Sequence, residues 1–428
     1  MNKTIKKVSN LNGTITVPGD KSISHRAVML GALSKGTSHI TGFLNGDDCL
    51  STISCFRQMG IEIETDGRNV TVHGKGLHGL KKPDNILDVG NSGTTLRLMT
   101  GILSAQNFMC GVTGDSSIQK RPMDRVIAPL SLMGADISGT SKNGKLCAPL
   151  TITGKKLRSI EYMLPVASAQ VKSAVILAGL YAEGDTTVVE PEPTRDHTEI
   201  MLNCLGADIS RTGNKIICRP VKELYAADIS VPADISSAAY FITAGIICPE
   251  SCITIKNVGI NPTRTGILDV YGQMGADIVL SNEKTVCGER TADITVKTSQ
   301  LKGTVIGGGI IPRLIDEIPV IAAAACFASG RTIIKDAQEL KVKETNRIKT
   351  VVEELSKMGA DIQETDDGMV INPAGNLKGA VCESHSDHRI AMSTAVAGLM
   401  ASGETVIYGA ECVDISFPGF FELLDSLH

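Results

Sequence analysis

Basic residues stand at the beginning of several apolar segments of this 428-residue sequence, where they could bind an anion. Lys21 and Arg26 lie in DKSISHR, Lys172 lies in SAQVK, and Arg389 lies in DHR. If each apolar segment is a helix, a cation in its first turn opposes the helix dipole. A bound anion would offset that cost, because a helix N-terminus and a nearby cation together form an anion site. These residues therefore predict a site for phosphate or carboxylate groups.

Three charged loops could contribute further cations to such a site. They are Lys120-Arg121-Pro122, Arg195-Asp196-His197 and the run from Lys341 to Arg347. Each loop taken singly could also be an ordinary solvated surface loop. The spacing Gly90-x-x-Gly93 fits neither the P-loop nor the dinucleotide-binding motif, so the sequence indicates no ATP or dinucleotide site.

Polar residues at the same segment starts have a simpler explanation as helix caps. Ser168, Asp234, Ser236 and Asp387 could each accept a backbone N–H bond at a helix N-terminus. Capping does not explain the cations, however. The segment His385-Ser386-Asp387-His388 shows no carboxylate–histidine pattern that would support a metal site, so we expect no metal.

The apolar segments belong to an internal repeat, which must position any site that they carry. A helix, a glycine turn and a β-branched strand recur six times, in residues 30–40, 100–112, 178–188, 243–255, 323–334 and 397–409. A second phrase of the form MGADI follows five of these copies, with its glycine at Gly60, Gly134, Gly206, Gly275 and Gly359. These glycines are 69 to 84 residues apart, so we predict one folding unit used six times.

One copy of the second phrase shows how the unit is expected to fold. Val126, Leu130 and Met133 fall at i, i+4 and i+7, on one face of a helix. Gly134 then suits the left-handed residue that ends a helix, and Asn143-Gly144 predicts a hairpin turn after the next strand. The first helix of each unit is apolar nearly all round, which indicates a position inside a core.

The length and the repeat together predict two domains. Residues 19–232 would form one lobe of three units, and residues 1–18 with 233–428 would form the other, completed by the N-terminal strand. The chain would cross at Pro18-Gly19-Asp20 and Val231-Pro232-Ala233, since proline favours an extended residue before it. If the helices of each lobe point the same way, the anion site is expected in a cleft between the lobes.

The composition narrows the class of function. A net charge of −4 gives no global attraction for nucleic acid or anionic lipid, and 3% aromatic residues argue against stacking on single strands. We expect neither a signal peptide nor a membrane-spanning segment. None of the 12 cysteines forms a CxxC pair, so we expect reduced, mostly buried thiols in a cytoplasmic protein.

Taken together, the motifs resemble those of a known enzyme family. They are PGDKSISHR (18–26), NSGTT (91–95), KRP (120–122), SAQVK (168–172), RDHTE (195–199), NPTR (261–264), KETNR (343–347) and DHR (387–389). The sequence resembles the EPSP synthases, or 3-phosphoshikimate 1-carboxyvinyltransferases, in order over essentially the whole chain. The resemblance implies an α/β fold: a two-domain inverted α/β prism built from six βαβαββ repeats. The forms GDK, SAQ-x-K, R-x-H-x-E and N-x-T-R look like the class II branch.

The reaction implied by the resemblance joins two anionic substrates. The enolpyruvyl group of phosphoenolpyruvate is transferred to the 5-hydroxyl of shikimate 3-phosphate, through a tetrahedral intermediate and with release of phosphate. This step belongs to the shikimate pathway, which leads to chorismate and the aromatic amino acids. The resemblance implies no cofactor, no metal and no partner beyond the two substrates, and we expect a monomer. Two phosphates and a carboxylate need many cations, which the sequence supplies.

The resemblance also assigns residues to the two substrates. Those implied for shikimate 3-phosphate are Lys21, Ser22, Arg26, Ser168, Gln170, Arg195, Asp316 and Lys343. Those implied for phosphoenolpyruvate are Lys21, Gly93, Arg121, Gln170, Arg347 and Arg389. Asp316 is the implied base for the hydroxyl, Glu344 the implied proton donor or shuttle, and Lys21 the third implied catalytic residue. Asp316 could instead be another N-cap, like its neighbour Glu317, and His388 could assist or only shape the pocket.

One position departs from the family pattern, and another bears on the response to the inhibitor glyphosate. Ile415 stands where many members carry a Lys that contacts phosphoenolpyruvate, just before Ser416-Phe417-Pro418. Gly93 is associated with ordinary inhibitor access, whereas class II members are often glyphosate-tolerant, so the sequence leaves the response to glyphosate open.

Three other functions fit the sequence less well. The sister enolpyruvyl transferase that acts on UDP-N-acetylglucosamine normally carries a reactive Cys, but the comparable loop, Thr113 to Arg121, has none. A non-catalytic anion-binding protein is disfavoured by the joint presence of Lys21, Asp316 and Glu344. An RNA-end-processing enzyme is disfavoured by the acidic charge and the few aromatic residues.

Overall fold

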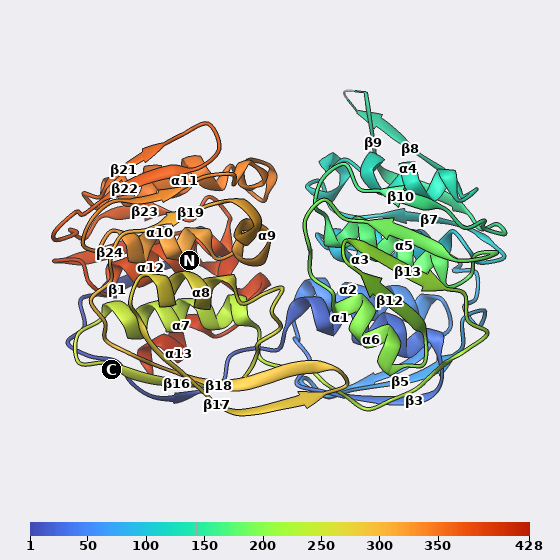
Figure 1. The fold of residues 1–428 in the computed structure, drawn as a ribbon, viewed down its shortest axis with the longest axis horizontal. Helices are drawn as coiled ribbons and strands as arrows, with labels where there is room; N and C mark the ends of the chain where they lie inside the picture. Colours follow the sequence, from blue (N-terminus) through green and yellow to red (C-terminus); the bar gives the residue numbers. More distant parts are fainter. Residues whose placement is uncertain (143) are drawn as a thin grey trace. The chain divides into compact units, whose positions relative to one another are not determined.

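The computed structural model describes residues 1–142 and 144–428, which divide into two compact units. Unit 1 comprises Met1–Pro18, Pro232–Lys284 and Arg290–His428, and unit 2 comprises Gly19–Val231 and Thr285–Glu289. The chain is mixed α/β, and its described residues form six small sheets, three based in each unit (Figure 1).

The sheets of unit 2 follow one another along the chain. The first contains β14 (Leu224–Tyr225), β3 (Ser34–Thr41), β5 (Val70–Lys75) and β4 (Glu62–Thr65), with β15 (Ile229–Ser230) also beside β3. The second has the order β6 (Leu87–Asp88), β7 (Met109–Thr113), β9 (Lys145–Thr153) and β8 (Asp136–Lys142). The third has the order β10 (Glu161–Met163), β11 (Thr186–Val189), β13 (Lys215–Arg219) and β12 (Asp208–Thr212).

The sheets of unit 1 follow the same plan. One contains β17 (Asp277–Val286), β18 (Glu289–Lys297), β16 (Cys252–Gly259) and β2 (Asn12–Ile15). Another contains β19 (Val305–Ile306), β20 (Thr332–Ile334), β22 (Met369–Asn372) and β21 (Asp361–Glu364). The third contains β1 (Asn2–Lys6), β24 (Glu404–Tyr408) and β23 (Val381–Glu383). Every sheet within the described ranges has a short strand parallel to a neighbour whose other partner is antiparallel.

The apolar helices predicted inside the core are buried there. They are α1 (Lys21–Leu33), α3 (Gly93–Leu103) and α5 (Ala169–Gly179) in unit 2, and α7 (Ile235–Ile247), α10 (Ile318–Ala325) and α12 (His388–Gly398) in unit 1. Every residue of α7 and of α10 is buried. A helix with no polar face is most stable when all of its sides are removed from water, which explains why these helices lie inside the core.

The second helices of the repeat end at the predicted glycines. These helices are α2 (Asp47–Gln58), α4 (Asp124–Leu132), α6 (His197–Cys204), α8 (Gly266–Gln273) and α11 (Arg347–Lys357). The glycines that follow them have φ between +83° and +98°, the left-handed region in which a side chain is strained. The remaining helices are the short α9 (Ile311–Leu314) and α13 (Phe420–Asp425), with 3-10 turns η1 (Ile118–Lys120), η2 (Gly308–Ile310), η3 (Gln338–Val342) and η4 (Ala410–Ile415).

The hairpin predicted at Asn143-Gly144 falls partly outside the described residues, because Asn143 is not among them. The two strands that it would join are antiparallel, and Lys142 of β8 pairs with Lys145 of β9.

The cysteines depart in one respect from the expectation of reduced thiols. Cys204, the last residue of α6, forms a disulfide with Cys287, and their Cα atoms lie 5.5 Å apart, within the range that a disulfide needs. The expectation is wrong for this pair because 83 residues separate its members, so only the tertiary fold brings them together. Cys252 is exposed, and the other free cysteines of the described residues are buried.

A search of the described residues finds no helix with the length and apolar character needed to span a membrane.

Candidate active site

The first two turns of α1 place Lys21 and Arg26 beside carboxylates and hydroxyls of unit 2. Asp20 caps this helix, and its Oδ1 accepts a hydrogen bond from the Ile23 amide at 2.9 Å. Lys21 forms an ion pair with the largely buried Asp48. Burial acts to raise the pKa of Asp48, but the charge of Lys21 outweighs it and holds that pKa below its usual value.

Arg26 is 4% exposed and is held by neutral oxygens. Its Nε donates to Thr198 Oγ1 at 2.7 Å, its Nη2 to Ser173 Oγ at 2.9 Å, and its Nη1 to the backbone oxygen of Ser22 at 2.9 Å. Burial lowers the pKa of Arg26 to about 10, so the guanidinium remains charged at neutral pH. A buried cation among neutral acceptors is a natural binding partner for an anion.

The start of α3 brings together Gly93, Arg97 and Gln170. Arg97 Nη1 donates to Gln170 Oε1 at 2.8 Å, and Gln170 Nε2 donates to Thr94 Oγ1 at 3.1 Å. A Cβ added to Gly93 would lie 2.7 Å from Arg97 Nη1 and 3.2 Å from Arg121 Nη1. The absence of a side chain at position 93 therefore leaves room for both guanidinium groups.

Arg97 is a residue that the sequence reasoning missed. It lies one helical turn after Gly93, so its side chain returns to the helix start, and this i+4 spacing is the signal that could have identified it. Burial lowers its pKa to about 10. Arg121, from the loop after η1, donates through Nη2 to Asn91 Oδ1 at 3.0 Å.

Ser168 caps α5 as predicted, but Lys172 in the same turn has a different role from the one expected. Ser168 Oγ accepts from the Val171 amide at 3.4 Å. Lys172 is fully buried, and its Nζ lies 3.1 Å from Glu190 Oε1 and 2.7 Å from Glu199 Oε1. The prediction that Lys172 helps to bind an anionic ligand is therefore wrong. A buried ammonium needs carboxylates of its own, and these two occupy it.

Two other predicted ligands lie close to these groups along the chain. Ser22 is the second residue of α1, and Arg195 lies in the loop that leads into α6. Neither is buried. The cations and polar groups of unit 2, namely Lys21, Arg26, Gly93, Arg121 and Gln170, are called the unit 2 group below.

Unit 1 gathers the other predicted residues around Arg347, the first residue of α11. Arg347 is 1% exposed and contacts three carboxylates: Nε is 2.8 Å from Asp387 Oδ2, Nη1 is 3.4 Å from Asp316 Oδ1, and Nη2 is 2.5 Å from Glu344 Oε2. Lys343 Nζ donates to the same Asp316 Oδ1 at 3.2 Å. Asp316, Lys343, Glu344, Arg347, Asp387 and Arg389 are called the unit 1 network.

The network is tied to the start of α12. Asp387 Oδ1 caps this helix by accepting from the Arg389 amide at 3.0 Å. Arg389 Nη1 donates to the backbone oxygen of Asp316 at 2.9 Å. His388, which lies between Asp387 and Arg389 in the chain, is largely buried. The three helix starts α10, α11 and α12 therefore meet through side chains rather than through backbone pairing.

The ionisation of these groups follows from their neighbours. Burial acts to raise the pKa of Glu344 and of Asp387, but the charge of Arg347 outweighs it and lowers both below their usual values. Burial acts to lower the pKa of Arg347, and the charges of Glu344 and Asp387 raise it instead. These opposite shifts favour the charged forms of Glu344, Asp387 and Arg347.

The capping alternative for Asp316 does not hold, and one predicted cap is also wrong. The N-cap of α10 is Glu317, which makes no side-chain capping bond, whereas Asp316 belongs to the preceding turn and pairs with Lys343. Asp234 caps α7 through the Ser236 amide, at 2.8 Å. Ser236 itself lies inside the helix and donates to Glu317 Oε1, because Asp234, two residues earlier, already fills the cap position.

The position that carries a Lys in many family members is occupied by a hydrophobic side chain. Ile415 ends η4 and is 38% exposed, while Phe417 beside it is buried. Ile415 offers no hydrogen bond or charge to a phosphate.

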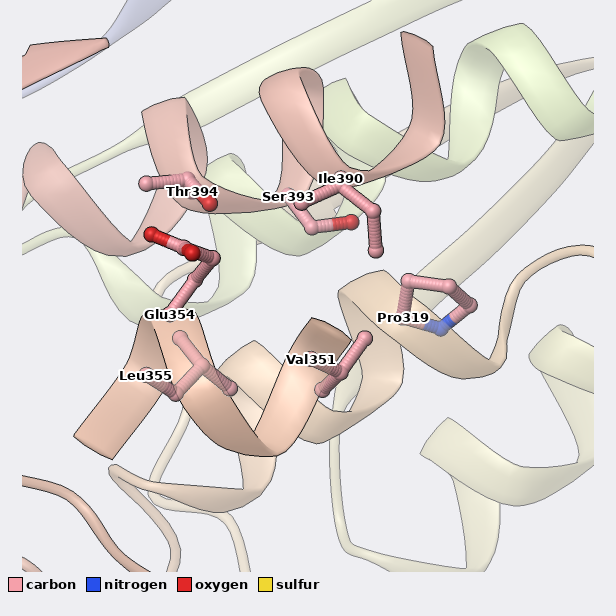
Figure 2. Close-up of a pocket in the computed structure, with 7 residues that line it drawn as sticks. All are labelled: Pro319, Val351, Glu354, Leu355, Ile390, Ser393 and Thr394. Atoms are coloured by element: carbon pink, nitrogen blue, oxygen red, sulfur yellow. The ribbon is translucent and has the colours of Figure 1, made fainter. Parts of the chain in front are cut away.

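A small hollow lies between α10, α11 and α12 of unit 1 (Figure 2). Its lining residues are Pro319, Val351, Glu354, Leu355, Ile390, Ser393 and Thr394. Glu354 Oε1 already lies 2.8 Å from Lys357 Nζ and 2.7 Å from His385 Nε2. Since none of the lining residues belongs to either group, the hollow is not the candidate site.

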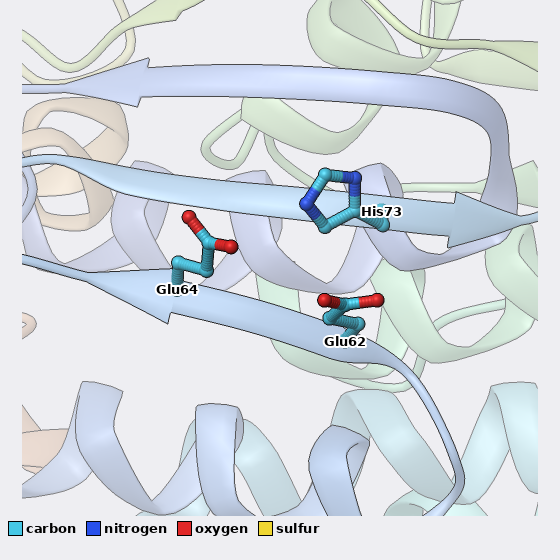
Figure 3. Close-up of side chains that lie close together, drawn as sticks. All are labelled: Glu62, Glu64 and His73. Atoms are coloured by element: carbon cyan, nitrogen blue, oxygen red, sulfur yellow. The ribbon is translucent and has the colours of Figure 1, made fainter.

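Potential metal ligands come together at another place, on β4 and β5 of unit 2. Glu62, Glu64 and His73 point toward one another from adjacent strands (Figure 3). The two carboxylates are exposed, and His73 Nδ1 lies 3.1 Å from Thr37 Oγ1. Exposed carboxylates on the outer face of a sheet are common without a metal, so these residues do not define a metal site.

Comparisons with known proteins point in one direction. Residues 5–424 match the family model of EPSP synthase (3-phosphoshikimate 1-carboxyvinyltransferase). A protein named 3-phosphoshikimate 1-carboxyvinyltransferase from Thermoanaerobacter sp. (strain X514) is 58% identical over 427 residues, covering 100% of both chains. One of the same name from Bacillus thuringiensis subsp. konkukian (strain 97-27) is 57% identical over 426 residues, covering 99% of both.

The fold gives the same answer. The structure of an EPSP synthase from Acinetobacter baumannii superimposes with a TM-score of 0.91 at 48% identity, covering 100% of this chain and 98% of that one. Sequence and structure agree over the full length, and the chain belongs to the EPSP synthase (3-phosphoshikimate 1-carboxyvinyltransferase) family.

Proposed function

We propose that this protein transfers the enolpyruvyl group of phosphoenolpyruvate to the 5-hydroxyl of shikimate 3-phosphate and releases phosphate. The observation that carries this proposal is the presence of two cation groups at buried helix starts in a member of this family. Arg26 faces neutral oxygens, and Arg347 holds three carboxylates. The first arrangement suits anion binding, and the second also supplies groups that can exchange protons.

The residues proposed for shikimate 3-phosphate combine cations with hydrogen-bonding groups. They are Lys21, Ser22, Arg26, Ser168, Gln170, Arg195, Asp316 and Lys343. Those proposed for phosphoenolpyruvate are Lys21, Gly93, Arg121, Gln170, Arg347 and Arg389. The contacts of Gln170 with Arg97 and Thr94 support its assignment, because they fix the amide and leave its orientation defined. Bidentate guanidinium groups recognise phosphate and carboxylate with defined geometry.

Addition of the substrate hydroxyl to the double bond needs a base for the hydroxyl and an acid for the methylene carbon. We propose Asp316 as the base, since its carboxyl group lies within ion-pair distance of Lys343 and Arg347. The proton that adds to the methylene carbon is lost again when phosphate leaves and the double bond re-forms. The acid and base roles are therefore exchanged between the two steps.

Glu344 is the proposed proton shuttle, although its pKa is lowered in the ligand-free protein. Arg347 is the main cause of that lowering after burial is allowed for. A phosphate that binds Arg347 would weaken the hold of the guanidinium on Glu344 and raise the carboxyl pKa. Binding would thus prepare Glu344 to carry a proton, and Lys21, paired with Asp48, would stabilise the negative charge of the substrates.

We also propose that the two units are the domains of an inverted α/β prism and that the protein acts as a monomer. Each unit has its own hydrophobic core and its own three sheets among the described residues, which supports this architecture.

A phosphate-release assay tests the activity. Phosphate is expected only when shikimate 3-phosphate and phosphoenolpyruvate are both present. Release with phosphoenolpyruvate and UDP-N-acetylglucosamine would overturn the proposal in favour of the sister reaction. Phosphoenolpyruvate alone is the control for simple hydrolysis, and adding glyphosate to the same assay would show how the inhibitor acts on this member of the family.

A further inference from the structure

The tip of the β17–β18 hairpin lies along one face of helix α6. Residues Thr285–Glu289 at this tip belong to unit 2, although the rest of the hairpin is part of a unit 1 sheet. Three consecutive tip residues, Cys287, Gly288 and Glu289, meet three residues of α6 in turn.

The contacts follow the helical period. Cys287 is bonded to Cys204, a Cβ on Gly288 would lie 2.7 Å from Ile200 Cγ2, and Glu289 Oε1 is 2.6 Å from His197 Nδ1. Positions 197, 200 and 204 are spaced by three and four residues, so they form one stripe of the helix. The tip is therefore aligned along α6 from its last residue to its first.

The contact at the beginning of the helix is buried and polar. His197 is 2% exposed and Glu289 is 4% exposed. Burying a carboxylate costs free energy unless a hydrogen-bond partner compensates for the lost water. The bond between Glu289 and His197 therefore holds these two side chains in a defined position. Because His197 is the first residue of α6, the bond fixes the first turn of the helix.

The same turn holds two cations on its other side. Thr198 Oγ1 accepts the hydrogen bond from Arg26 Nε at 2.7 Å and lies 2.7 Å from Ser173 Oγ. Glu199 pairs with the buried Lys172. A shift of this turn would move the acceptor of Arg26 directly, since Thr198 adjoins His197 in the chain.

We infer that Glu289 is a positioning residue for substrate binding: through His197 it fixes the first turn of α6 and thereby orients Arg26. The inference rests on the proposed function, in which Arg26 binds shikimate 3-phosphate. The negative charge of Glu289 also acts on Arg26, since it is one of the influences that raise the arginine pKa against the lowering by burial.

The test compares KM values for the two substrates in Glu289→Ala and in a control on the same hairpin, Glu283→Ala. Glu283 is half exposed and pairs with Arg290 at 2.9 Å, so its loss removes a carboxylate without touching α6. Glu289→Ala is expected to raise KM for shikimate 3-phosphate about 10-fold or more, as for a lost hydrogen bond to a charged group. KM for phosphoenolpyruvate and kcat are expected to change less than about 3-fold. Equal rises in both KM values would overturn the inference, because they indicate a general loss of structure.

A conservative variant guards against a folding failure. Glu289→Gln keeps an oxygen acceptor for a His197 Nδ1–H donor, so its KM for shikimate 3-phosphate is expected within about 3-fold of the parent value. A Gln variant as impaired as the Ala variant would contradict a role based on this hydrogen bond.

A double-mutant cycle with His197→Ala links the two residues. The double variant is expected to match either single variant in KM for shikimate 3-phosphate, because each single change already breaks the same bond. Additive effects would overturn the pathway through His197. Cys287→Ser removes the disulfide and leaves Glu289, so it should raise KM for shikimate 3-phosphate less than Glu289→Ala does. An equal rise would assign the effect to the disulfide and not to Glu289.

The proposed function and the inference fail in different ways. If the parent protein releases no phosphate from the two substrates, the proposed function is wrong. If the parent is active and Glu289→Ala behaves like Glu283→Ala, only the inference is wrong.

Discussion

The unit 2 group and the unit 1 network both place cations near helix starts, but they hold them differently. Arg26 in unit 2 donates to two hydroxyls and a backbone carbonyl. Arg347 in unit 1 contacts three carboxylates. Burial lowers the pKa of Arg26 to about 10, whereas the carboxylates raise the pKa of Arg347. A cation near a helix start can therefore either remain available to an anion or be part of an ion-pair network.

The different partners of Arg26 and Arg347 suit two different tasks, anion binding and proton transfer. A buried cation whose direct hydrogen-bond partners are neutral oxygens gains most from an incoming anion, so Arg26 of the unit 2 group is suited to binding. A network that already contains carboxylates gains less from the anion but can receive and return protons. Asp316 and Glu344 are two such carboxylates, and both pair with Arg347 in the unit 1 network.

The largest effect is expected from Asp316→Ala, which removes the proposed base from the unit 1 network. Loss of a general base typically lowers turnover by about 10²- to 10⁴-fold. Steady-state phosphate release measures this effect, with Asp366→Ala, an exposed turn residue of unit 1, as the matched control. Near-normal turnover would remove Asp316 from the mechanism and weaken the distinction between the two groups.

The next effect concerns stability and contrasts Arg347→Met with Arg26→Met. Arg347→Met leaves three carboxylates together without their shared cation, and breaking a buried ion pair in this way costs about 3–5 kcal/mol. Arg26→Met leaves only neutral oxygens, so a loss of about 1–3 kcal/mol is expected. Urea unfolding measures both free energies, and equal losses would contradict the proposed difference in how the cations are held.

Acid should act mainly on the unit 1 network. Glu344 and Asp387 have pKa values below their ordinary values of 4.5 and 3.8, so their contribution to stability is complete above those values. It is lost as pH falls from there through the lowered pKa values, because the unfolded chain then binds more protons. Calorimetry from pH 7 to pH 2 should show a falling Tm, and Arg347→Met should flatten that fall. An unchanged slope in this variant would show that other carboxylates control the response.

The smallest effect is expected from Gly93→Ala in the unit 2 group. The added Cβ would lie 2.7 Å from Arg97 Nη1, the end of a flexible side chain that can move aside. One weakened hydrogen bond of about 1 kcal/mol corresponds to a rise of roughly 5-fold in KM for phosphoenolpyruvate. KM for shikimate 3-phosphate should stay within about 2-fold, as measured by initial rates. An equal rise for both substrates would place Gly93 outside a phosphoenolpyruvate subsite.

Local sequence was sufficient to predict the repeating elements. Gly134 could be placed at a left-handed helix end because the pattern of Val126, Leu130 and Met133 comes directly before it. The apolar helices α7 and α10 could be placed in a core because they have no polar face. Family motifs then pointed to the activity, which composition alone did not indicate.

Contacts between distant segments could not be predicted in the same way. Lys172 looked like an anion ligand because the sequence does not show that Glu190 and Glu199 lie against its Nζ. Arg97 was overlooked because its importance depends on Gln170, 73 residues away. The pairing of Cys204 with Cys287 likewise depends on how the hairpin tip meets α6.

The buried free cysteines make the protein its own reporter of local opening. Burial raises the pKa of the Cys55, Cys218, Cys248 and Cys326 thiols to about 12, and a thiol reacts with alkylating reagents as the thiolate. Cys252, which is exposed, should be alkylated at once and serve as the internal reference. Cys55 and Cys218 lie in unit 2, and Cys248 and Cys326 lie in unit 1. Peptide mass spectrometry of pulse-alkylated protein would therefore time the opening of each unit separately, without any introduced label.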